Sequence, residues 1–367
     1  MKKLVIIGTG SHHVNLLLAL TQQALEGVQV TLVAPSLRQL FDPMLPGFVA
    51  GRVALEECLI DLEPRLKKSG IRYLPQSVAA LDMQAHTVTL TNGSSAEFDW
   101  LSLNMGDVPD RAQLELQLPG VREHGLFLQP TEAFAKLWPS VIALAETRAL
   151  RIAVLGDSLQ SMEIALAVRY RLPTASITLV MNSSLLAQTC SAQFQANLAE
   201  ALKQRRITVL EDHAVCLSDG QVELGCGAAL VCDVPIVALR ALSPAWLAPS
   251  TLVLDEQGFV ATDEQQRAIG HPGVFSADQA TAANQQTIWR RRATHIAAGS
   301  AFAKALTSAI KGLPNQPRQG PAKSTFILAD GGHDAIASWG EYGAQGTWLW
   351  RLKNSIDRAA VQRLRQP

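Results

Sequence analysis

The chain has 367 residues, of which 48% are hydrophobic and 17% charged, and this is enough apolar sequence for two or three compact domains. Its 32 basic and 32 acidic residues leave a formal net charge of zero, which excludes a global field that would steer nucleic acid or a membrane surface toward it. The five cysteines are scattered without a C-x-x-C pair, which argues against a disulfide framework and against a dithiol redox centre.

The first predicted element is a strand over residues 3–7 (KLVII). Lys2 and Lys3 before an apolar run are reminiscent of a signal peptide, but Gly8 and Gly10 break the run and no clear small-residue cleavage site follows. No apolar stretch reaches the roughly 20 residues that are needed to cross a bilayer. We therefore expect a cytoplasmic protein, or at most one that is peripheral on the inner membrane face.

The first part of the chain follows a strand, turn, helix, strand order. A glycine turn after the first strand leads into an apolar helix at 14–20, and residues 28–34 (VQVTLVA) form the next strand. A short strand at 71–74 follows a helical stretch, and the turn signal TNGSS at 91–95 marks a run of short β segments. This order predicts a parallel βαβ unit that carries a β-meander.

The same order returns further along the chain. Residues 151–155 (RIAVL) precede Gly156 and a helix, further strands are predicted at 177–181 and 207–210, and the turn signal LSDG follows at 217–220. Two such units in one chain predict an α/β fold with two Rossmann-like dinucleotide-binding domains.

The expected domain boundaries follow from two changes in pattern. Near residue 240 the second unit ends, and the segment GHPGVFSADQATA (270–282) then precedes a predicted helix at about 287–310. A linker rich in Pro and Gly follows at 311–324. We expect a discontinuous first domain, an inserted second domain and a small C-terminal region, with the boundaries 1–110 and 240–312, 111–239, and 313–367 respectively.

The stretch VIIGTGSHHV (5–14) holds a G-x-G turn between the first strand and its helix. In such a turn the first glycine permits the bend, the second lets the backbone approach a pyrophosphate, and the helix N-terminus offers N–H groups. His13 stands where a third glycine usually packs helix on strand, so we expect looser packing or a side chain directed at the ligand. Two alternatives stay open: a metal site on His12 and His13, without a third ligand nearby, and a helix cap that meets solvent.

Six segments resemble, in this order, the flavoproteins with two dinucleotide-binding domains, a group that includes the pyridine nucleotide-disulfide oxidoreductases and the type II NADH dehydrogenases. They are VIIGTGSHHV (5–14), VTLVAPS (30–36), MLPGFVAG (44–51), FDWLSLNMGDVP (98–109), IAVLGDSLQSMEIALAV (152–168) and GVFSADQA (273–280). The chain is similar above all to the NADH-dehydrogenase-like flavoprotein found fused to selenide, water dikinase. That branch shares the histidine at the third glycine position, the M-L-P-G segment and a Trp-rich end, matched here by Gly346–Arg358.

The resemblance implies that the discontinuous first domain holds FAD. By it, the residues that line the pyrophosphate are Gly8, Gly10, Ser11, His12 and His13. Pro35 and Ser36 would lie beside the adenosine ribose, the backbone near Val78 beside the adenine, and Gly106 close to the cofactor. Asp278 would accept hydrogen bonds from the ribityl or pyrophosphate region and Gln279 would begin the helix that faces the flavin, while Asp278 as an N-cap is compatible with this role. The loop FDPMLPGF (41–48), with Pro43 and Pro46, would form a rigid wall near the flavin ring or an ordinary turn.

The second domain departs from the family pattern. Where NAD(P)-binding members show G-x-G-x-x-G-x-E, this chain keeps Gly156 and Glu163 alone. Ser158 puts a side chain where backbone would approach phosphate, and Asp157 adds a negative charge beside it. Arg240 either offsets this charge by pairing with phosphate or blocks the site. The sequence thus leaves NAD(P)H binding open and weighs against it.

The C-terminal segment, residues 346–367, carries five basic residues and one acid. An apolar stripe with a cationic surround is predicted because apolar residues recur there at helical spacing, namely Trp348, Leu352, Ile356, Ala359 and Leu364. Such a helix either lies on an anionic membrane or docks on its own FAD domain or on a second subunit, as in a homodimer.

The resemblance implies an FAD-dependent oxidoreductase of the NADH-dehydrogenase-like type, with small molecules as electron donor and acceptor, such as reduced nicotinamide and a quinone. Because a flavin itself carries hydride and electron chemistry, no catalytic residue and no metal ligand is predicted. The alternative is a flavin-binding protein whose degenerate nicotinamide site makes it a binding or regulatory module. We expect no nucleic-acid partner, since the arginines at 290–292 are too few to form a binding patch.

Overall fold

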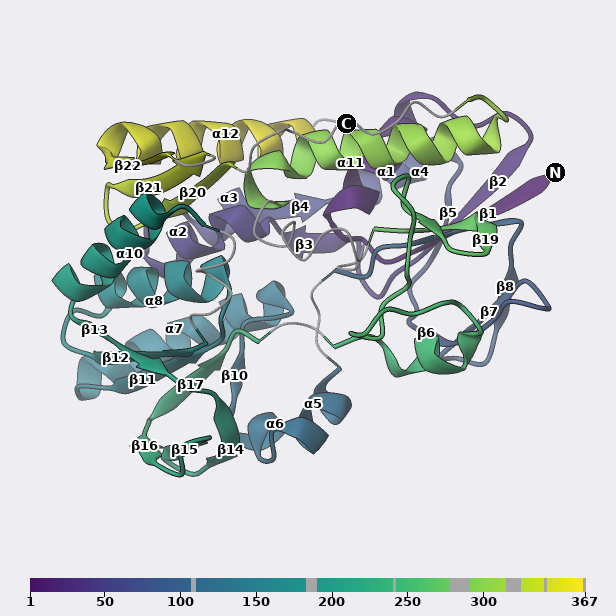
Figure 1. Cartoon of the computed structure of the whole chain (residues 1–367). Coiled ribbons are helices and arrows are strands. Elements are labelled where there is room, and N and C mark those ends of the chain that lie inside the picture. Colours follow the sequence, from purple (N-terminus) through teal and green to yellow (C-terminus); the bar gives the residue numbers. More distant parts are fainter. Residues whose placement is uncertain are drawn as a thin grey trace.

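A computed structural model of the chain describes residues 1–106, 110–182, 190–239, 242–277, 291–314, 325–339 and 342–365. Its framework consists of two largely parallel sheets, each with helices and a small antiparallel meander, and a C-terminal hairpin sheet (Figure 1). The predicted α/β fold with two Rossmann-like units is confirmed.

The first sheet has six strands in the order β18-β19-β9-β1-β2-β5. Their bounds are Lys2–Ile7 (β1), Val28–Val33 (β2), Arg72–Leu74 (β5), Trp100–Leu103 (β9), Arg267–Ala268 (β18) and His271–Ser276 (β19). All neighbours pair in parallel except β18 and β19. Since β19 lies beside β9, a segment from beyond residue 240 completes the sheet that begins at residue 2.

Alternation along β1 decides which elements cover the first sheet. Leu4 and Ile6 pack on one face with α1 (Ser11–Gln22), α4 (Glu63–Ser69) and α11 (Arg291–Ile310). Val5 and Ile7 pack on the other face with the meander and a short 3-10 helix, whose bounds are Val78–Asp82 (β6), Thr87–Leu90 (β7), Ser95–Glu97 (β8) and Ala245–Ser250 (η2). Because successive side chains of β1 point to opposite faces of the sheet, they belong to two separate hydrophobic cores.

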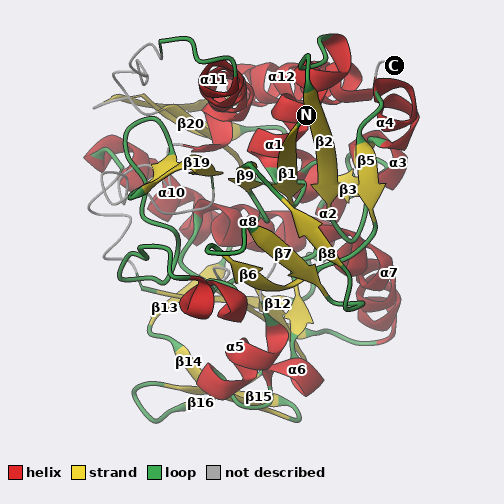
Figure 2. Ribbon diagram, turned by 90° about the vertical axis from the view of Figure 1, so that its right-hand side faces the viewer, coloured by secondary structure: helices red, strands yellow, loops and turns green. Residues whose placement is uncertain are grey.

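The second sheet has five parallel strands in the order β10-β17-β11-β12-β13. Their bounds are Leu126–Phe127 (β10), Arg151–Leu155 (β11), Ser176–Met181 (β12), Ile207–Glu211 (β13) and Val234–Val237 (β17). The helices and meander of this unit are Arg111–Gln117 (α5), Val121–His124 (α6), Thr131–Thr147 (α7), Leu159–Arg171 (α8), Ala192–Gln204 (α10), Ala214–Ser218 (β14), Gln221–Leu224 (β15) and Ala229–Val231 (β16). In Figure 2 the β14–β16 meander lies at the bottom of the molecule, far from α11 and α12.

The two units share one plan, as the sequence predicts. In each, a central strand is flanked by the next strand on one side and by the strand that follows the meander on the other, β1 by β2 and β9, and β11 by β12 and β17. The first helix differs from the prediction in its bounds, because it begins at Ser11 directly after the turn and not at residue 14. Both histidines therefore belong to its first turn.

Between the two sheets lies a short segment of irregular structure. It consists of β3 (Arg38–Leu40), η1 (Asp42–Met44), α2 (Leu45–Val49), α3 (Leu55–Cys58) and β4 (Leu59–Asp61). α2 packs against α7 and α8 of the second unit, so this segment of the first unit carries part of the contact between them.

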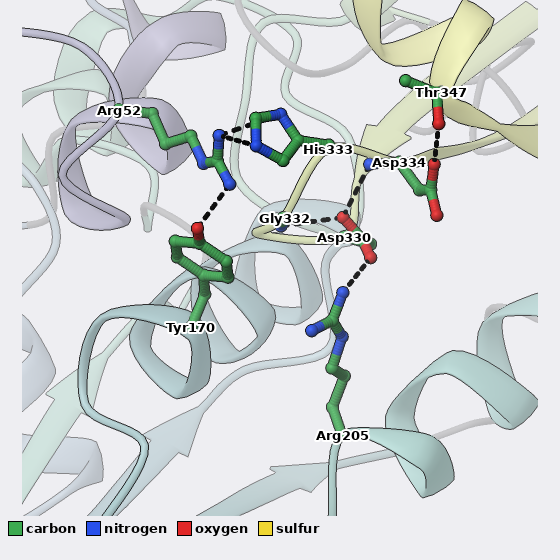
Figure 3. Close-up of polar contacts among 8 residues, drawn as sticks. All are labelled: Arg52, Tyr170, Arg205, Asp330, Gly332, His333, Asp334 and Thr347. Atoms are coloured by element: carbon green, nitrogen blue, oxygen red, sulfur yellow. Dashed lines mark hydrogen bonds and ion pairs between the residues drawn. The ribbon is translucent and has the colours of Figure 1, made fainter.

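The C-terminal segment packs against both units. Its antiparallel sheet, β20 (Thr325–Ala329), β21 (Ala335–Trp339) and β22 (Tyr342–Gly346), lies on α8 and α10, and α12 (Thr347–Arg365) reaches β4 and η1. The loop after β20 binds the second unit through Asp330, whose carboxylate lies 2.5 Å from Arg205 (Figure 3). In the same view, Arg52 of the first unit contacts both His333 and Tyr170.

The apolar stripe predicted for α12 does not form the face that packs on the chain, and its contact with a membrane or a second subunit stays a prediction. Trp348, Leu352 and Ile356 are 57%, 44% and 46% exposed, and of the five predicted residues Leu364 alone is buried. The face that packs against the chain holds Leu349, Asp357, Ala360, Val361 and Leu364. The buried face contains charged residues because they form ion pairs there. A prediction from hydropathy alone places such residues in solvent.

Candidate functional site

A cavity of about 690 Å³ extends between the two units. It begins at the carboxyl ends of β1, β2 and β9 and reaches the segments before α7 and α8 and after β17. Its wall includes residues 7–12, 76–78, 104–106, 128–132, 158–160 and 238–239. Ligands of open α/β sheets bind in this position, outside the carboxyl ends of the strands.

The glycine turn forms the floor of the cavity at its first-unit end. Gly8 has a φ of +87°, and a methyl group on it would lie 2.4 Å from the carbonyl oxygen of Asn104. A methyl group on Gly10 would lie 2.3 Å from Asn104 Oδ1. Both positions therefore require glycine, because the turn passes directly against the end of β9.

The N-terminus of α1 points at the cavity without a side-chain cap of its own, since Gly10 is the N-cap residue. Ser11 and His12 line the cavity. The backbone N–H groups of His12 and His13 donate to Asn104 Oδ1 at 3.0 and 3.3 Å. This end of a 12-residue helix carries the positive end of the helix dipole.

His13 does not lie in the cavity wall, where the resemblance places it. Its side chain is fully buried behind the turn, where Nδ1 lies 2.8 Å from the Gly8 carbonyl oxygen and Nε2 lies 2.7 Å from Ser102 Oγ. Burial lowers the pKa of His13 to about 4, so the ring is neutral at pH 7. The imidazole takes the place of a third glycine by forming hydrogen bonds inside the fold, and it does not meet solvent.

The residues expected around the adenosine lie together in the wall. Pro35 and Ser36, after β2, line the same cavity as Val78 at the start of β6, and so does Gly106 after β9. The Ser36 hydroxyl donates to the carbonyl of Arg38 at 2.9 Å and accepts from its N–H at 3.0 Å. Contact of these residues with a nucleotide stays a prediction.

The proline-containing loop divides between two cavities. Pro43 of η1 lines the large cavity, whereas Pro46 of α2 is buried beside a separate cavity of about 40 Å³ near Trp350. Of the two prolines, Pro43 alone therefore lies in the wall of the large cavity, and contact of the loop with a flavin stays a prediction. The chain turns into a helix at Leu45, which carries Pro46 away from the large cavity.

The second unit contributes the N-terminus of α8. Ser158, Leu159 and Gln160 line the cavity, but Gly156 does not. The Ser158 hydroxyl accepts from the Ser161 N–H at 3.1 Å, so this helix is capped by its own side chain. A helix N-terminus that is already capped has fewer N–H groups to offer to a phosphate.

Glu163, the acidic residue that the chain keeps from the family's nicotinamide motif, lies outside the cavity. Its carboxylate is completely buried, accepts from the Ala329 N–H at 2.9 Å and lies 3.9 Å from Lys353 Nζ. Lys353 also donates to the Pro43 carbonyl and to Asp357, each at 2.7 Å. Glu163 therefore supports the C-terminal segment, and Lys353 joins that segment to the cavity wall at Pro43.

Some site residues were missed from the sequence, and others lie outside the described part. Asn104, Glu132 and Trp246 line the cavity, and the Glu132 carboxylate accepts from the Leu40 N–H at 2.5 Å. An asparagine beside the glycine in LNMG was the available signal for Asn104. Asp278, Gln279, Arg240 and Arg290 fall outside the described residues.

The described part of the wall supplies no thiol and no group of metal ligands. None of the five cysteines is in a disulfide, and none of them lines this cavity. In the part of the chain that the structure describes, no three His, Cys, Asp or Glu side chains are grouped as metal ligands. No described helix is both long enough and apolar enough to cross a membrane.

Comparison of the sequence with family models gives one match, over residues 2–299, to the family described as pyridine nucleotide-disulphide oxidoreductase. The alternative NAD(P)H-ubiquinone oxidoreductase C1 of Arabidopsis thaliana is 25% identical over 290 residues, which are 68% of this chain and 54% of that protein. An NADH dehydrogenase-like protein of Mycobacterium tuberculosis is 23% identical over 243 residues, 62% of this chain and 60% of that protein. The chain thus spans just over half the length of these relatives.

Solved structures share the fold at low identity. The sulfide:quinone oxidoreductase of Aquifex aeolicus superposes with a TM-score of 0.76 at 15% identity, over 100% of this chain and 92% of that one. The NDH2 of Plasmodium falciparum, solved in complex with NADH, superposes with a TM-score of 0.73 at 13% identity, over 100% and 99%. These superpositions establish the arrangement of the elements.

Proposed function

Because the chain belongs to the pyridine nucleotide-disulphide oxidoreductase family, we propose that it is an FAD-dependent oxidoreductase of the NADH-dehydrogenase-like type. In this proposal it passes electrons from a reduced nicotinamide to a quinone or another acceptor. The two relatives of the preceding comparison, an NAD(P)H-ubiquinone oxidoreductase and an NADH dehydrogenase-like protein, support this reaction class.

The observation that carries the proposal is one cavity that joins the glycine turn of the first unit to the second unit. The turn fits a dinucleotide: Gly8 and Gly10 keep the backbone free of side chains, and the N-terminus of α1, with the positive end of its dipole, faces the cavity. The volume lies in the range of cofactor sites. The residues present therefore fit FAD.

In this proposal the first unit binds the cofactor, and the second unit encloses it together with Pro43 of the first unit. Gly8, Gly10, Ser11 and His12 hold the diphosphate, and Pro35, Ser36 and Val78 hold the adenosine. Pro43 and residues 128–132 and 158–160 exclude water from the far end of the cavity. The flavin supplies the hydride and electron chemistry when bound, so the wall needs to orient the ring and not to react. Asp278, Gln279 and Gly106 complete the proposed cofactor contacts.

The absorption spectrum of the purified protein tests the proposal. We expect a flavin spectrum, loss of its visible band under anaerobic conditions on addition of NADH or NADPH, and its return on addition of a soluble quinone. A yellow protein that neither nucleotide bleaches would exclude the dehydrogenase reaction. A colourless protein that takes up no FAD would exclude the flavoprotein altogether.

A second candidate function is a flavin-bound binding or regulatory module with a degenerate nicotinamide site. It is favoured by the second unit, in which Ser158 puts a side chain where the family pattern has a phosphate-binding glycine, and this side chain caps α8. The negative charge of Asp157 beside this cap adds to the argument. The bleaching experiment separates the two functions, because a module of this kind keeps its flavin oxidised in the presence of both nucleotides.

The finer placement, in the branch of flavoproteins fused to selenide, water dikinase, is also a proposal. It is supported by His13 at the third glycine position and by the segment Gly346–Arg358. Selenide added to the anaerobic, oxidised protein tests it: two electrons pass to the flavin as selenide is oxidised to elemental selenium, and a selenium-linked oxidoreductase should be reduced faster than free FAD is, whereas an ordinary NADH dehydrogenase should not.

For the domains we propose an FAD-binding domain of residues 1–110 and 240–312, a nicotinamide-type domain of 111–239 and a C-terminal region of 313–367. The pairing of β19 with β9 supports the discontinuity of the first. The exposed residues Trp348, Leu352 and Ile356 of α12 support peripheral contact with an anionic membrane on its cytoplasmic face, or with a second copy of the chain.

A further inference from the structure

Asn104 occupies the point at which four segments of the first unit meet. Its N–H donates to Ile7 at the end of β1, and its carbonyl accepts from Gly10 in the turn, at 3.0 and 2.9 Å. Its side-chain Oδ1 accepts from the first turn of α1, and its Nδ2 donates at 3.3 Å to the carbonyl of Ala277, after β19. The side chain is 4% exposed and lies in the cavity wall.

The shape of the glycine turn follows from this residue. The two glycine positions that cannot accept a methyl group are closed by atoms of Asn104, its carbonyl oxygen at Gly8 and its Oδ1 at Gly10. In the usual three-glycine turn, the third glycine sets the distance between helix and strand. Here His13 stands in that place, and the side-chain amide of Asn104, directly after β9, binds the N-terminus of α1.

The side chain at this position must be an amide for two reasons. It accepts from two N–H groups through Oδ1 and donates to a carbonyl through Nδ2; a carboxylate has no donor, and a hydroxyl would have to make all three bonds with one oxygen. It is also neutral, whereas a carboxylate beside the same N–H groups would oppose a negatively charged diphosphate in the cavity.

We infer that Asn104 is the positioning residue of the dinucleotide turn and that its neutral amide makes the site selective for a flavin that carries a diphosphate. The inference rests on the proposed binding of FAD. Ser102, two residues earlier on β9, provides the matched control, because its hydroxyl holds His13 behind the turn and does not reach the cavity.

The test compares FAD with riboflavin, which lacks the diphosphate, as ligands of the apo-protein by flavin fluorescence titration. For Asn104→Asp we expect about a 100-fold loss of FAD affinity, since a new negative charge lies at the helix end, with part of it recovered at high ionic strength. Riboflavin affinity should stay within a few-fold of the wild type. Ser102→Ala should lower the melting temperature and leave the ratio of FAD to riboflavin affinity unchanged.

Each other outcome has a definite meaning. Equal losses for FAD and riboflavin, or no loss for either, would overturn the role of Asn104 while the flavoprotein proposal stands. A wild-type protein that binds no FAD would instead remove the proposed function. If Asn104→Asp does not fold, Asn104→Ala carries the same comparison, with an expected loss of about tenfold for FAD and none for riboflavin, because the turn loses its support but gains no charge.

Discussion

His13 is held neutral by its surroundings. The ring is fully buried between the Gly8 carbonyl and Ser102, and its pKa of about 4 lies below the ordinary value of 6.5 because the charged form would lose its hydration. The unfolded chain therefore binds a proton on this residue at a higher pH than the folded chain does. The contribution of the neutral, buried His13 ring to the free energy of unfolding is complete above pH 6.5 and is lost as the pH falls through that value toward 4.

We predict that wild-type stability falls by up to about 3 kcal/mol between pH 6.5 and 4 through this residue alone, since one unit of pKa corresponds to about 1.4 kcal/mol. His13→Asn should be less stable at pH 7 but should lose this part of the pH dependence. Urea unfolding of both proteins at several pH values measures it. Parallel pH profiles for the two proteins would contradict the assignment.

Residue-level roles were predictable where the local chain determines them. Gly8 and Gly10 follow from the turn itself, and their place in the cavity was expected. Glu163 and Pro46 were assigned to cofactor contacts by resemblance, yet each is buried against a segment more than 150 residues away, β20 or α12. No local pattern reports such a contact.

At the scale of elements, α12 shows why hydropathy does not identify the face that packs on the chain. Lys353 and Asp357 pair with each other on its buried side, so two charged residues stand where apolar ones are expected. Breaking a buried pair leaves an uncompensated charge, which costs more than the pair itself contributes. Strands were easier to predict, because β1 and β11 contain the continuous apolar runs LVII and IAVL, which are typical of parallel sheets.

We predict that Lys353→Met destabilises the protein by about 3 kcal/mol, because Asp357 and Glu163 lose the ammonium group between them. Arg351→Met, on the exposed side of the same helix, should change stability by less than about 0.5 kcal/mol. Denaturant unfolding of both variants provides the comparison. Similar effects of the two substitutions would show that the buried cluster of Glu163, Lys353 and Asp357 contributes no more to stability than an exposed side chain does.

The exposed stripe of α12 leads to a prediction for membranes. Replacement of Trp348, Leu352 and Ile356 by Ser should abolish co-sedimentation with anionic vesicles, because apolar area provides the insertion energy of a surface helix. A matched triple variant of exposed residues elsewhere, Leu116, Val231 and Ile269 to Ser, should bind vesicles as the wild type does. Retained vesicle binding by the α12 variant would exclude this surface as a membrane-binding site. Sedimentation of the same variant would then test the surface as a contact between subunits.

For the whole molecule, two features could be predicted from the sequence: the repeat of two βαβ units and the return of the chain to the first sheet. The packing of the two units against each other could not be predicted, because it depends on α2, the cavity wall and the C-terminal segment, which have no periodic pattern of apolar residues. These parts join the units, since α2 packs on α8 while β20 packs on α8 and α12 on β4.

Such an arrangement predicts that cofactor binding stabilises both units at once. Because the cavity wall comes from both, FAD at about 100 times its dissociation constant should add about 2.7 kcal/mol to the stability of the folded state. Calorimetry should then show one transition that moves upward as a whole. A transition that splits, with one part unaffected by FAD, would show that the units unfold independently of the cavity.

Trp246 of η2 stands in the wall of the cavity and is one of seven tryptophans in the chain. Indole emission overlaps the absorption of oxidised flavin, so in the proposed complex with FAD energy transfer from this ring should quench the tryptophan fluorescence. Addition of FAD to the apo-protein can then be followed by this quenching, without an added label.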